Sequence, residues 1–334
     1  MSDTRTAARL RLLMSGCALL LAACGGGGPD AGSPGAPPPP SPPGNAARTA
    51  AATATAQSTS NACNAIRPFY WEIGDRSAAL ASGAVGGSAY GPGTVMNIAS
   101  SSKWLYGAYV VQRRAGVLTA EDIQHLTFRS GYTRFAICLQ GQTVDGCLNY
   151  LNNGVLVPAS VGRFDYGGGH MQKHASLIGL GGMNNAALAA ELRSQLGTDI
   201  ALAFSQPQPA GGIVSTPVDY ARFLRKLLDG SLILGSRLGS RAVCTNPLTC
   251  PTADGTPVPT TESWHYSLGH WVEDDPRVGD GTFSSAGAFG FYPWIDAART
   301  HYGIVAREAA GGSGEASANC GRLIRKAWVT AVAN

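Results

Sequence analysis

The sequence predicts an α/β (α+β) fold, in which an antiparallel sheet flanked by helices is joined to a mostly helical subdomain. Two observations support this fold. Short candidate strands lie towards both ends of the globular part, at 69–73, 77–83, 267–272 and 301–307. Helix-patterned segments occupy the middle and the end, at 100–115, 170–180, 185–196, 217–228 and 320–332. We therefore expect the two ends of the globular part to build the sheet subdomain and the middle to build the helical one.

Two of the expected helices carry clear signals. At 217–228, Ser215 or Thr216 can cap the helix and Pro217 fits its first turn. The apolar face of this segment consists of Ile213, Tyr220, Phe223, Leu224 and Leu227. The last helix has apolar residues at helical spacing, namely Leu323, Ile324, Ala327, Trp328 and Ala331. We interpret the first of these segments as scaffold rather than as chemistry.

The amino terminus is typical of an exported protein. Three arginines precede an apolar run at 12–23, which is too short to span a bilayer in the mature protein. The run therefore predicts a signal peptide over 1–23. Its end, Leu-Ala-Ala-Cys, resembles a bacterial lipobox, which implies cleavage before Cys24 and lipidation of that cysteine. A glycine follows instead of an aspartate, which implies a lipoprotein on the outer membrane of a bacterial cell envelope.

The segment after Cys24 predicts a tether. As far as about residue 60 it is rich in Gly, Pro, Ala, Ser and Thr, and it has almost no large apolar residue whose burial could offset the entropy of ordering. The prolines at 37–43 favour a stiff polyproline II stretch that holds the domain away from the lipid. We expect a disordered tether over 24–60 and a globular domain over 61–334, long enough for one large or two closely packed subdomains.

Six cysteines remain when the signal peptide and Cys24 are set aside. An even number of cysteines in an exported chain predicts disulfides, although many pairings of six are possible. Proximity in the sequence, and elimination for the last pair, favour Cys138–Cys147, Cys244–Cys250 and Cys63–Cys320. The C-x-x-C spacing of redox and zinc sites does not occur.

A candidate nucleophile stands at the start of one expected helix. Ser100 and Lys103 lie three residues apart in the stretch NIASSSKW. Residues at i and i+3 share a helix face, so the lysine amine can approach the serine hydroxyl, which also feels the positive end of the helix dipole. This S-x-x-K arrangement gives a weak nucleophile a neighbouring base. An N-cap serine beside a solvated lysine is the alternative interpretation.

Four segments follow one another in the chain: NIASSSKW at 97–104, IQHLTFRSG at 123–131, FDYGGG at 164–169 and GGIVSTPVDYARF at 211–223. Together, and in this order, they resemble the serine β-lactamase and penicillin-binding-protein superfamily, especially its class C-like esterase, amidase and peptidase branch. The third segment sits where the family has Tyr-x-Asn, and the fourth is close to a long family motif. The resemblance covers about 69–332 and implies a β-lactamase-like fold with the active site in the cleft between the two subdomains.

The family's Lys-Thr-Gly motif, on the edge strand beside the nucleophile, corresponds here to Ser285-Ala286-Gly287. The resemblance implies an oxyanion hole made by the amides of Ser100 and Ala288, and substrate contacts from Ser285 and Gly287. In penicillin-recognising members, the lysine of this motif binds a substrate carboxylate. Its replacement by serine favours a neutral ester or amide substrate.

Tyr166 retains the tyrosine of the family's second motif. Its phenol, with an ordinary pKa near ~10, is expected to assist proton transfer beside Lys103, and a core tyrosine beside a glycine-rich turn is the alternative. Gly168 stands where the family has Asn, and with His170 it is expected to contact the substrate. His170 and His174 have metal-ligand spacing, but a third ligand is not evident, so we expect no metal.

These residues predict an exported serine hydrolase that acts through an acyl-enzyme on a small-molecule or oligomeric ester or amide. One alternative is a D-Ala-D-Ala peptidase or β-lactamase, in which Arg129 or Arg307 would hold the substrate carboxylate. Another is a degenerate penicillin-fold binding lipoprotein. The sequence implies no cofactor, and the membrane is expected as a partner only through the lipid. The net charge of +4 is scattered rather than clustered with aromatics, which excludes a nucleic-acid footprint.

Overall fold

The computed structural model describes residues 43–334. The predicted signal peptide over 1–23 and the lipid site at Cys24 lie outside these residues and stay predictions. Within the described part of the chain, no helix is both long enough and apolar enough to cross a membrane.

One large antiparallel sheet organises the molecule, with the strand order β2-β1-β13-β12-β11-β10-β9-β7. Its strands are β1 (Phe69–Asp75), β2 (Ala79–Val85), β7 (Val243–Cys244), β9 (His265–Ser267), β10 (His270–Glu273), β11 (Thr282–Ser284), β12 (Tyr292–Ile295) and β13 (His301–Ala306). Strands from both ends of the described chain therefore meet in one sheet, as expected from the sequence.

Two small sheets complete the β structure. The first runs in the order β3-β6-β5 and contains β3 (Met96–Asn97), β5 (Leu202–Phe204) and β6 (Ile213–Ser215). The second pairs β4 (Phe164–Asp165) in parallel with β8 (Ala253–Gly255). The first sheet supports the segment that leads into the candidate nucleophile, because β3 ends just before it.

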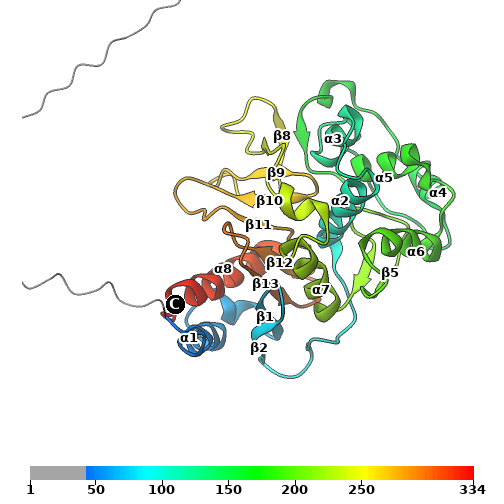
Figure 1. Ribbon diagram of the computed structural model, residues 1–334. Coiled ribbons are helices and arrows are strands. Elements are labelled where there is room, and N and C mark those ends of the chain that lie inside the picture. The colour runs from blue at the N-terminus through cyan, green and yellow to red at the C-terminus, as the bar shows by residue number, and fades with distance from the viewer. Residues whose placement is uncertain (1–42) are drawn as a thin grey trace, which may run out of the picture. The chain divides into compact units, whose positions relative to one another are not determined.

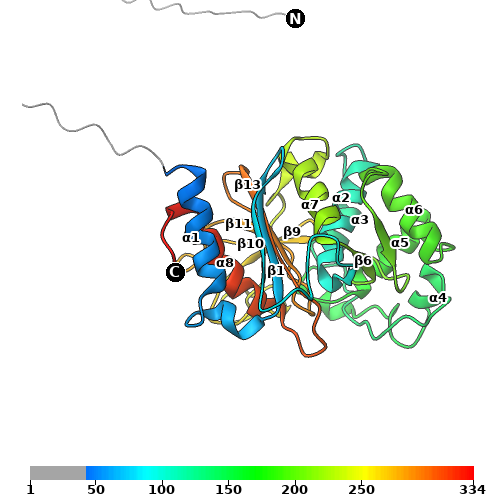
Figure 2. The same ribbon diagram turned by 90° about the horizontal axis from the view of Figure 1, so that it is seen from below.

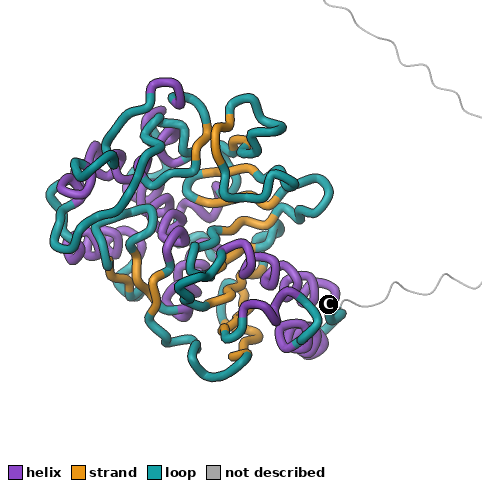
Figure 3. Tube along the Cα trace, turned by 180° about the vertical axis from the view of Figure 1, so that it is seen from behind, coloured by secondary structure: helices purple, strands orange, loops and turns teal. Residues whose placement is uncertain are grey.

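The α-helices of the described residues are α1 (Asn45–Gln57), α2 (Ser102–Arg113), α3 (Ala120–Leu126), α4 (Val144–Leu148), α5 (Gly169–Ala175), α6 (Asn185–Leu196), α7 (Pro217–Leu228) and α8 (Gly314–Thr330). Short 3₁₀ turns are η1 (Ala62–Ile66), η2 (Ala99–Ser101), η3 (Pro158–Ser160) and η5 (Ile233–Arg237), and η4 (Ser176–Leu180) is a π turn. Figure 1 shows α2 to α6 gathered beside the sheet, and Figure 3 shows long loops between them. The expected helical subdomain is therefore present.

Helices cover both faces of the large sheet. Along β1, Phe69, Trp71 and Ile73 belong to the apolar cluster under α1 and α8, whereas Tyr70 belongs to the larger cluster on the other face. This alternation follows from the two-residue period of a strand. Figure 2 shows the sheet between α1 and α8 on one side and α7 and α2 on the other.

The predicted tether over 24–60 is wrong in its second half, because residues 45–57 form α1 and pack on α8. Alanine has the highest helix propensity of all residues, and Ala52 and Ala56 are fully buried one turn apart in the interface with α8. The Arg48 guanidinium also donates to the Trp328 carbonyl of α8, at 3.3 Å. The same small residues that lack bulk for a core of their own fit closely against a partner helix.

Other expected elements differ mainly at their ends. The predicted strand over 267–272 is the β9–β10 hairpin with its turn, and the last helix begins at Gly314 rather than Cys320 because Ser313 caps it by accepting from the Ala316 amide. The helices expected over 185–196 and 217–228 have the predicted bounds. All three expected disulfides are present, namely Cys63–Cys320, Cys138–Cys147 and Cys244–Cys250.

Candidate active site

Ser100 lies in the short η2 turn that leads directly into α2. Ala99, just before it, has a φ of 45°, in the left-handed region that costs a non-glycine residue about 1 kcal/mol. The turn is held from several sides. The Tyr220 hydroxyl of α7 donates to the Ser101 carbonyl at 2.9 Å, and the Ile98 amide donates to the Ile213 carbonyl of β6 at 3.1 Å.

The Lys103 amine lies 2.9 Å from the Ser100 hydroxyl. One helical turn separates the two residues, so this contact follows from the helix itself. The amine also donates to the Ala210 carbonyl at 2.7 Å. Lys103 is 5% exposed, and burial lowers its pKa to about 7. A large fraction of this amine is therefore neutral near pH 7 and able to accept a proton.

Tyr166 completes a compact group with these two residues, because the Lys103 nitrogen lies 4.8 Å from the centre of its ring. The ring stacks on Trp271 of β10, with 5.1 Å between the centroids. Burial raises the pKa of Tyr166 to about 12, although hydrogen bonding with the Ser100 and Trp271 side chains opposes the increase. The phenol is therefore protonated at neutral pH, which suits a proton donor better than a resting base.

The loop after β11 brings the third motif against the nucleophile turn. A Cβ at Gly287 would lie 2.2 Å from the Ile98 carbonyl oxygen, so the close approach requires glycine. The Ser285 hydroxyl donates to the Ser100 carbonyl at 3.1 Å. Within residues 43–334 the Ala288 amide has no hydrogen-bond acceptor. An unpaired amide beside a nucleophile is able to stabilise a developing oxyanion.

A cavity of about 320 Å³ opens onto this group. Ser100, Tyr166, Ala286 and Ala288 line one part of it. The remainder is lined by the loop before β9, by β10 and by the start of α8, through Pro257, Val258, Pro259, Glu262, Trp264, Trp271, Gly312, Ser313, Gly314, Glu315, Ala318, Asn319 and Arg322. The walls are largely apolar and aromatic, as in typical small-molecule sites.

No protein-family model matches the chain, and no curated protein sequence matches it. Solved structures do match. EstCE1, a hydrolase with promiscuous acyltransferase activity, aligns with a TM-score of 0.56 at 13% identity, over 85% of this chain and 99% of EstCE1. A D-stereospecific amidohydrolase from Streptomyces sp. aligns with a TM-score of 0.54 at 13% identity, over 87% of this chain and 100% of the other. An octameric penicillin-binding protein homologue from Pyrococcus abyssi aligns with a TM-score of 0.55 at 12% identity, over 80% of this chain and 74% of the other.

The chain has the β-lactamase-like fold. At these identities the likeness concerns the arrangement of the backbone, and the chemistry of the site has to be argued from its own residues. In this β-lactamase-like chain, the structure brings together Ser100, Lys103, Tyr166 and Ala288. Of these residues, only Ser100 and Lys103 are close to each other in the sequence.

Three expected substrate contacts do not line the cavity. Ser285 is 2% exposed and bonds the nucleophile turn, and Gly287 packs on the same turn. Gly168 packs beside the Phe135 ring. The short side chain of Ser285 therefore ends at the backbone of Ser100 and does not reach the cavity.

His170 is also not a substrate contact. It is fully buried, with its two ring nitrogens at 2.7 Å from the Ser130 hydroxyl and 3.0 Å from the Asp165 carbonyl. His174, equally buried, lies between the Asp122 carboxylate and the Tyr106 hydroxyl. No group of potential metal ligands occurs in the part of the chain that the structure describes. Both histidines are satisfied core residues of the helical subdomain.

The α8 side of the cavity was not expected from the sequence. Glu315, Ala318, Asn319 and Arg322 follow the spacing of one helix face, and they line the cavity together. This signal was overlooked because the helix was expected to begin only at Cys320. Arg322 is consequently the arginine that lines the cavity, and neither of the two arginines named from the sequence does.

Proposed function

We propose that this protein is a serine hydrolase that cleaves an ester or amide through an acyl-enzyme. The observation that carries the proposal is the 2.9 Å contact between the Ser100 hydroxyl and a buried Lys103 amine whose pKa is about 7. A lysine with an ordinary pKa would be charged at neutral pH and unable to accept a proton. Here the base is poised near the operating pH.

In the first half-reaction, the Lys103 amine accepts the hydroxyl proton while Ser100 Oγ attacks the substrate carbonyl. The carbonyl oxygen gains the negative charge, and the amides of Ser100 and Ala288 stabilise it. Removing one such donor typically costs roughly 10²- to 10³-fold in rate. The Tyr166 hydroxyl donates a proton to the departing alcohol or amine and regains one from Lys103. The bond from the carbonyl carbon to the leaving group breaks, and the acyl group remains on Ser100.

In the second half-reaction, water replaces the leaving group. The neutral Lys103 amine, directly or through Tyr166, accepts a proton as the water oxygen attacks the acyl carbon. The same two amides stabilise the second tetrahedral intermediate. The proton then returns to Ser100 Oγ as the acid product leaves, which restores the starting state. The apolar walls formed by Trp264 and Trp271 exclude bulk water and strengthen these electrostatic interactions.

The decisive experiment compares the wild-type protein with Ser100→Ala. We expect the wild type to hydrolyse short-chain p-nitrophenyl esters and to react with a fluorophosphonate, with one adduct per chain detected by mass spectrometry. Ser100→Ala is expected to lose both properties because its nucleophile is absent. Ser77→Ala, in the exposed turn between β1 and β2, is the matched control and should retain both.

The neighbouring serines are unsuitable controls, although they point away from the catalytic face. The Ser101 hydroxyl donates to the Ser285 carbonyl at 2.6 Å, and the Ser102 hydroxyl accepts from the Ile213 amide at 3.2 Å. Both are buried and hold the nucleophile turn in place. Undiminished hydrolysis by Ser100→Ala would overturn the proposal. A folded wild-type protein that hydrolyses no ester and takes up no phosphonate would instead favour a degenerate binding protein.

A further inference from the structure

Among the charged residues that line the catalytic cavity, acids outnumber bases. They comprise two acids, Glu262 and Glu315, and one base, Arg322. Glu315 is exposed and lies in the first turn of α8. Arg322 lies two turns further along the same helix. A substrate that carries a carboxylate into this cavity would depend on Arg322 for a cationic partner.

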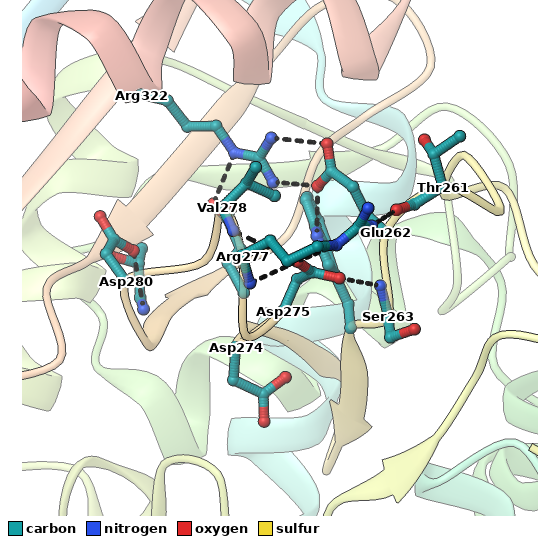
Figure 4. Close-up of polar contacts among 12 residues, drawn as sticks. Thr261, Glu262, Ser263, Asp274, Asp275, Arg277, Val278, Asp280 and Arg322 are labelled. Atoms are coloured by element: carbon teal, nitrogen blue, oxygen red, sulfur yellow. Dashed lines mark hydrogen bonds and ion pairs between the residues drawn. The ribbon is translucent and has the colours of Figure 1, made fainter. Parts of the chain in front are cut away.

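Arg322 is already occupied. Its two terminal nitrogens donate to the two oxygens of Glu262, at 3.2 and 2.8 Å, and its Nε donates to Glu273 at 3.0 Å. The guanidinium also lies 4.6 Å from the centre of the Trp264 ring. Figure 4 shows Glu262 and Arg322 facing each other, with dashed lines that mark their contacts. The bidentate pairing uses the geometry in which a guanidinium would otherwise hold a substrate carboxylate.

The ionisation of Glu262 persists at neutral pH. Burial acts to raise its pKa, but the hydrogen bonds and charge of Arg322 outweigh burial, and the pKa of Glu262 lies below its ordinary value. The Trp264 indole N–H adds a third bond to this carboxylate, at 2.7 Å. Glu273 is also an acid, and both Arg322 and Arg325 pair with it. It therefore adds no positive charge that could bind a substrate carboxylate.

The loop that carries Glu262 is fastened to the β10–β11 turn. Asp275 accepts from the Ser263 amide at 2.8 Å and from the Arg277 amide at 2.9 Å. The Arg277 side chain donates back to the Thr261 carbonyl. Figure 4 shows these contacts directly beside the Glu262–Arg322 pair. Glu262 is therefore held in front of Arg322 by the backbone as well as by its own ion pair.

We propose that Glu262 is a specificity-determining residue that withholds Arg322 from substrate carboxylates, so that the cavity selects esters or amides without a negative charge. The inference rests on the proposed hydrolase function and names the substrate class of the same site. Two mechanisms contribute. Glu262 occupies the guanidinium of Arg322. Glu315, whose side chain forms no ion pair within residues 43–334, repels a substrate carboxylate at the same rim.

The test compares two substrates of similar shape, p-nitrophenyl hexanoate and the mono-p-nitrophenyl ester of adipic acid, which carries an additional carboxylate. The wild type is expected to prefer the hexanoate in kcat/KM. Glu262→Gln keeps an acceptor for Arg322 and Trp264 but removes the negative charge. It should raise the ratio of adipate to hexanoate kcat/KM by about tenfold or more, since a charge-assisted hydrogen bond becomes available to the substrate.

Three further variants make the result specific. Adding Arg322→Gln to Glu262→Gln should abolish the gain, because the cation is then absent. Glu121→Gln removes the charge of an exposed acid of α3 that does not line the cavity, and it should leave the ratio unchanged. Glu262→Ala should reproduce the gain if Glu262→Gln does not fold. An unchanged ratio in a folded Glu262 variant that still hydrolyses the hexanoate would overturn the inference.

A binding measurement separates this inference from the proposed function. Trp264 and Trp271 line the cavity, so tryptophan fluorescence can report binding, and the Ser100→Ala background prevents turnover of ester ligands. In that background, monomethyl adipate should bind the protein with Glu262→Gln at least about tenfold more tightly than the protein that keeps Glu262, whereas dimethyl adipate should bind both equally. Equal affinity of both proteins for monomethyl adipate would refute the role of Glu262, even if the esterase activity were absent. If the protein shows no esterase activity but the expected difference in binding is found, only the proposed hydrolase function is refuted.

Discussion

A single buried lysine sets the chemistry of the candidate site. Lys103 lies within hydrogen-bond distance of Ser100 and of the Ala210 carbonyl, and burial lowers its pKa to about 7. Burial disfavours the charged form of an amine and so lowers its pKa. In the proposed mechanism this buried amine serves as the base, and the protonated phenol of Tyr166 serves as the complementary acid.

The pH dependence of kcat/KM should follow Lys103. Below pH 7 the amine is protonated and cannot accept the Ser100 proton, so activity is expected to rise with pH through an apparent pKa of about 7 and then remain level as far as pH ~9. Tyr166 causes no alkaline decrease in this range, because its pKa is about 12. Hydrolysis of p-nitrophenyl acetate between pH ~5 and ~9 measures the profile.

Lys103→Arg provides the matching control for this profile. Arginine keeps the positive charge and stays protonated at every accessible pH, so this variant should lose at least about 10²-fold in kcat/KM at all pH values, the size of a typical general-base contribution. A profile without inflection near pH 7 in the wild type, or a Lys103→Arg variant with full activity, would show that another group accepts the proton.

At the scale of elements, α8 is bound to the sheet by a buried ionic network. Arg325 donates to Glu273 of β10 at 3.1 Å and to the Tyr292 hydroxyl of β12 at 3.0 Å. It also pairs with Asp280 at 2.7 Å. Glu273 is fully buried. The same helix presents Glu315, Asn319 and Arg322 to the cavity, so this network also positions one wall of the site.

We expect Arg325→Met to destabilise the protein by about 3–5 kcal/mol, because it leaves the carboxylate of Glu273 buried with one cation fewer. Chemical denaturation measures this change in the free energy of unfolding. Lys326→Met, on the exposed side of the same helix, is the control and should change stability by less than about 0.5 kcal/mol. A loss in Arg325→Met no larger than that of the control would mean that the network adds little to stability.

The whole molecule has a buried set of neutral histidines. Burial lowers the pKa of His125 to about 4 and that of His170 and His270 to about 3. All three are almost completely buried, and each accepts or donates hydrogen bonds as a neutral ring. His265 is only partly buried, and its hydrogen bond with Asp274 raises its pKa, so its effect on stability has the opposite sign.

The folded state should therefore lose stability as the pH falls below about 6.5. In that range the unfolded chain binds protons that the three buried histidines of the folded chain do not, and each of them costs about 1.4 kcal/mol per pH unit. The single opposing contribution of His265 does not balance three. Urea denaturation at pH ~7.5 and pH ~5 measures the difference. Equal stability at the two pH values would contradict the buried, neutral state of these rings.

Local patterns determined what the sequence could predict. The contact between Ser100 and Lys103 follows from helix geometry, since residues three apart share a face. The bounds of α6 and α7 follow from caps and apolar spacing within the same dozen residues. Two disulfides close short loops, and the third follows by elimination. Each of these features depends on residues close in the sequence or on a small set of possibilities.

The tertiary structure decided everything that depends on distant partners. It placed Ser285 on the nucleophile backbone, buried His170 away from the substrate, and set Glu262 opposite Arg322. It also made a helix of 45–57 by giving its alanines a surface to cover. Burial and charge pairing arise only when separate segments meet, and they control both the pKa of a base and the availability of a guanidinium. The sequence by itself therefore determined the candidate nucleophile and its neighbouring lysine, whereas the fold decided how that lysine titrates and, in our proposal, which substrates can approach it.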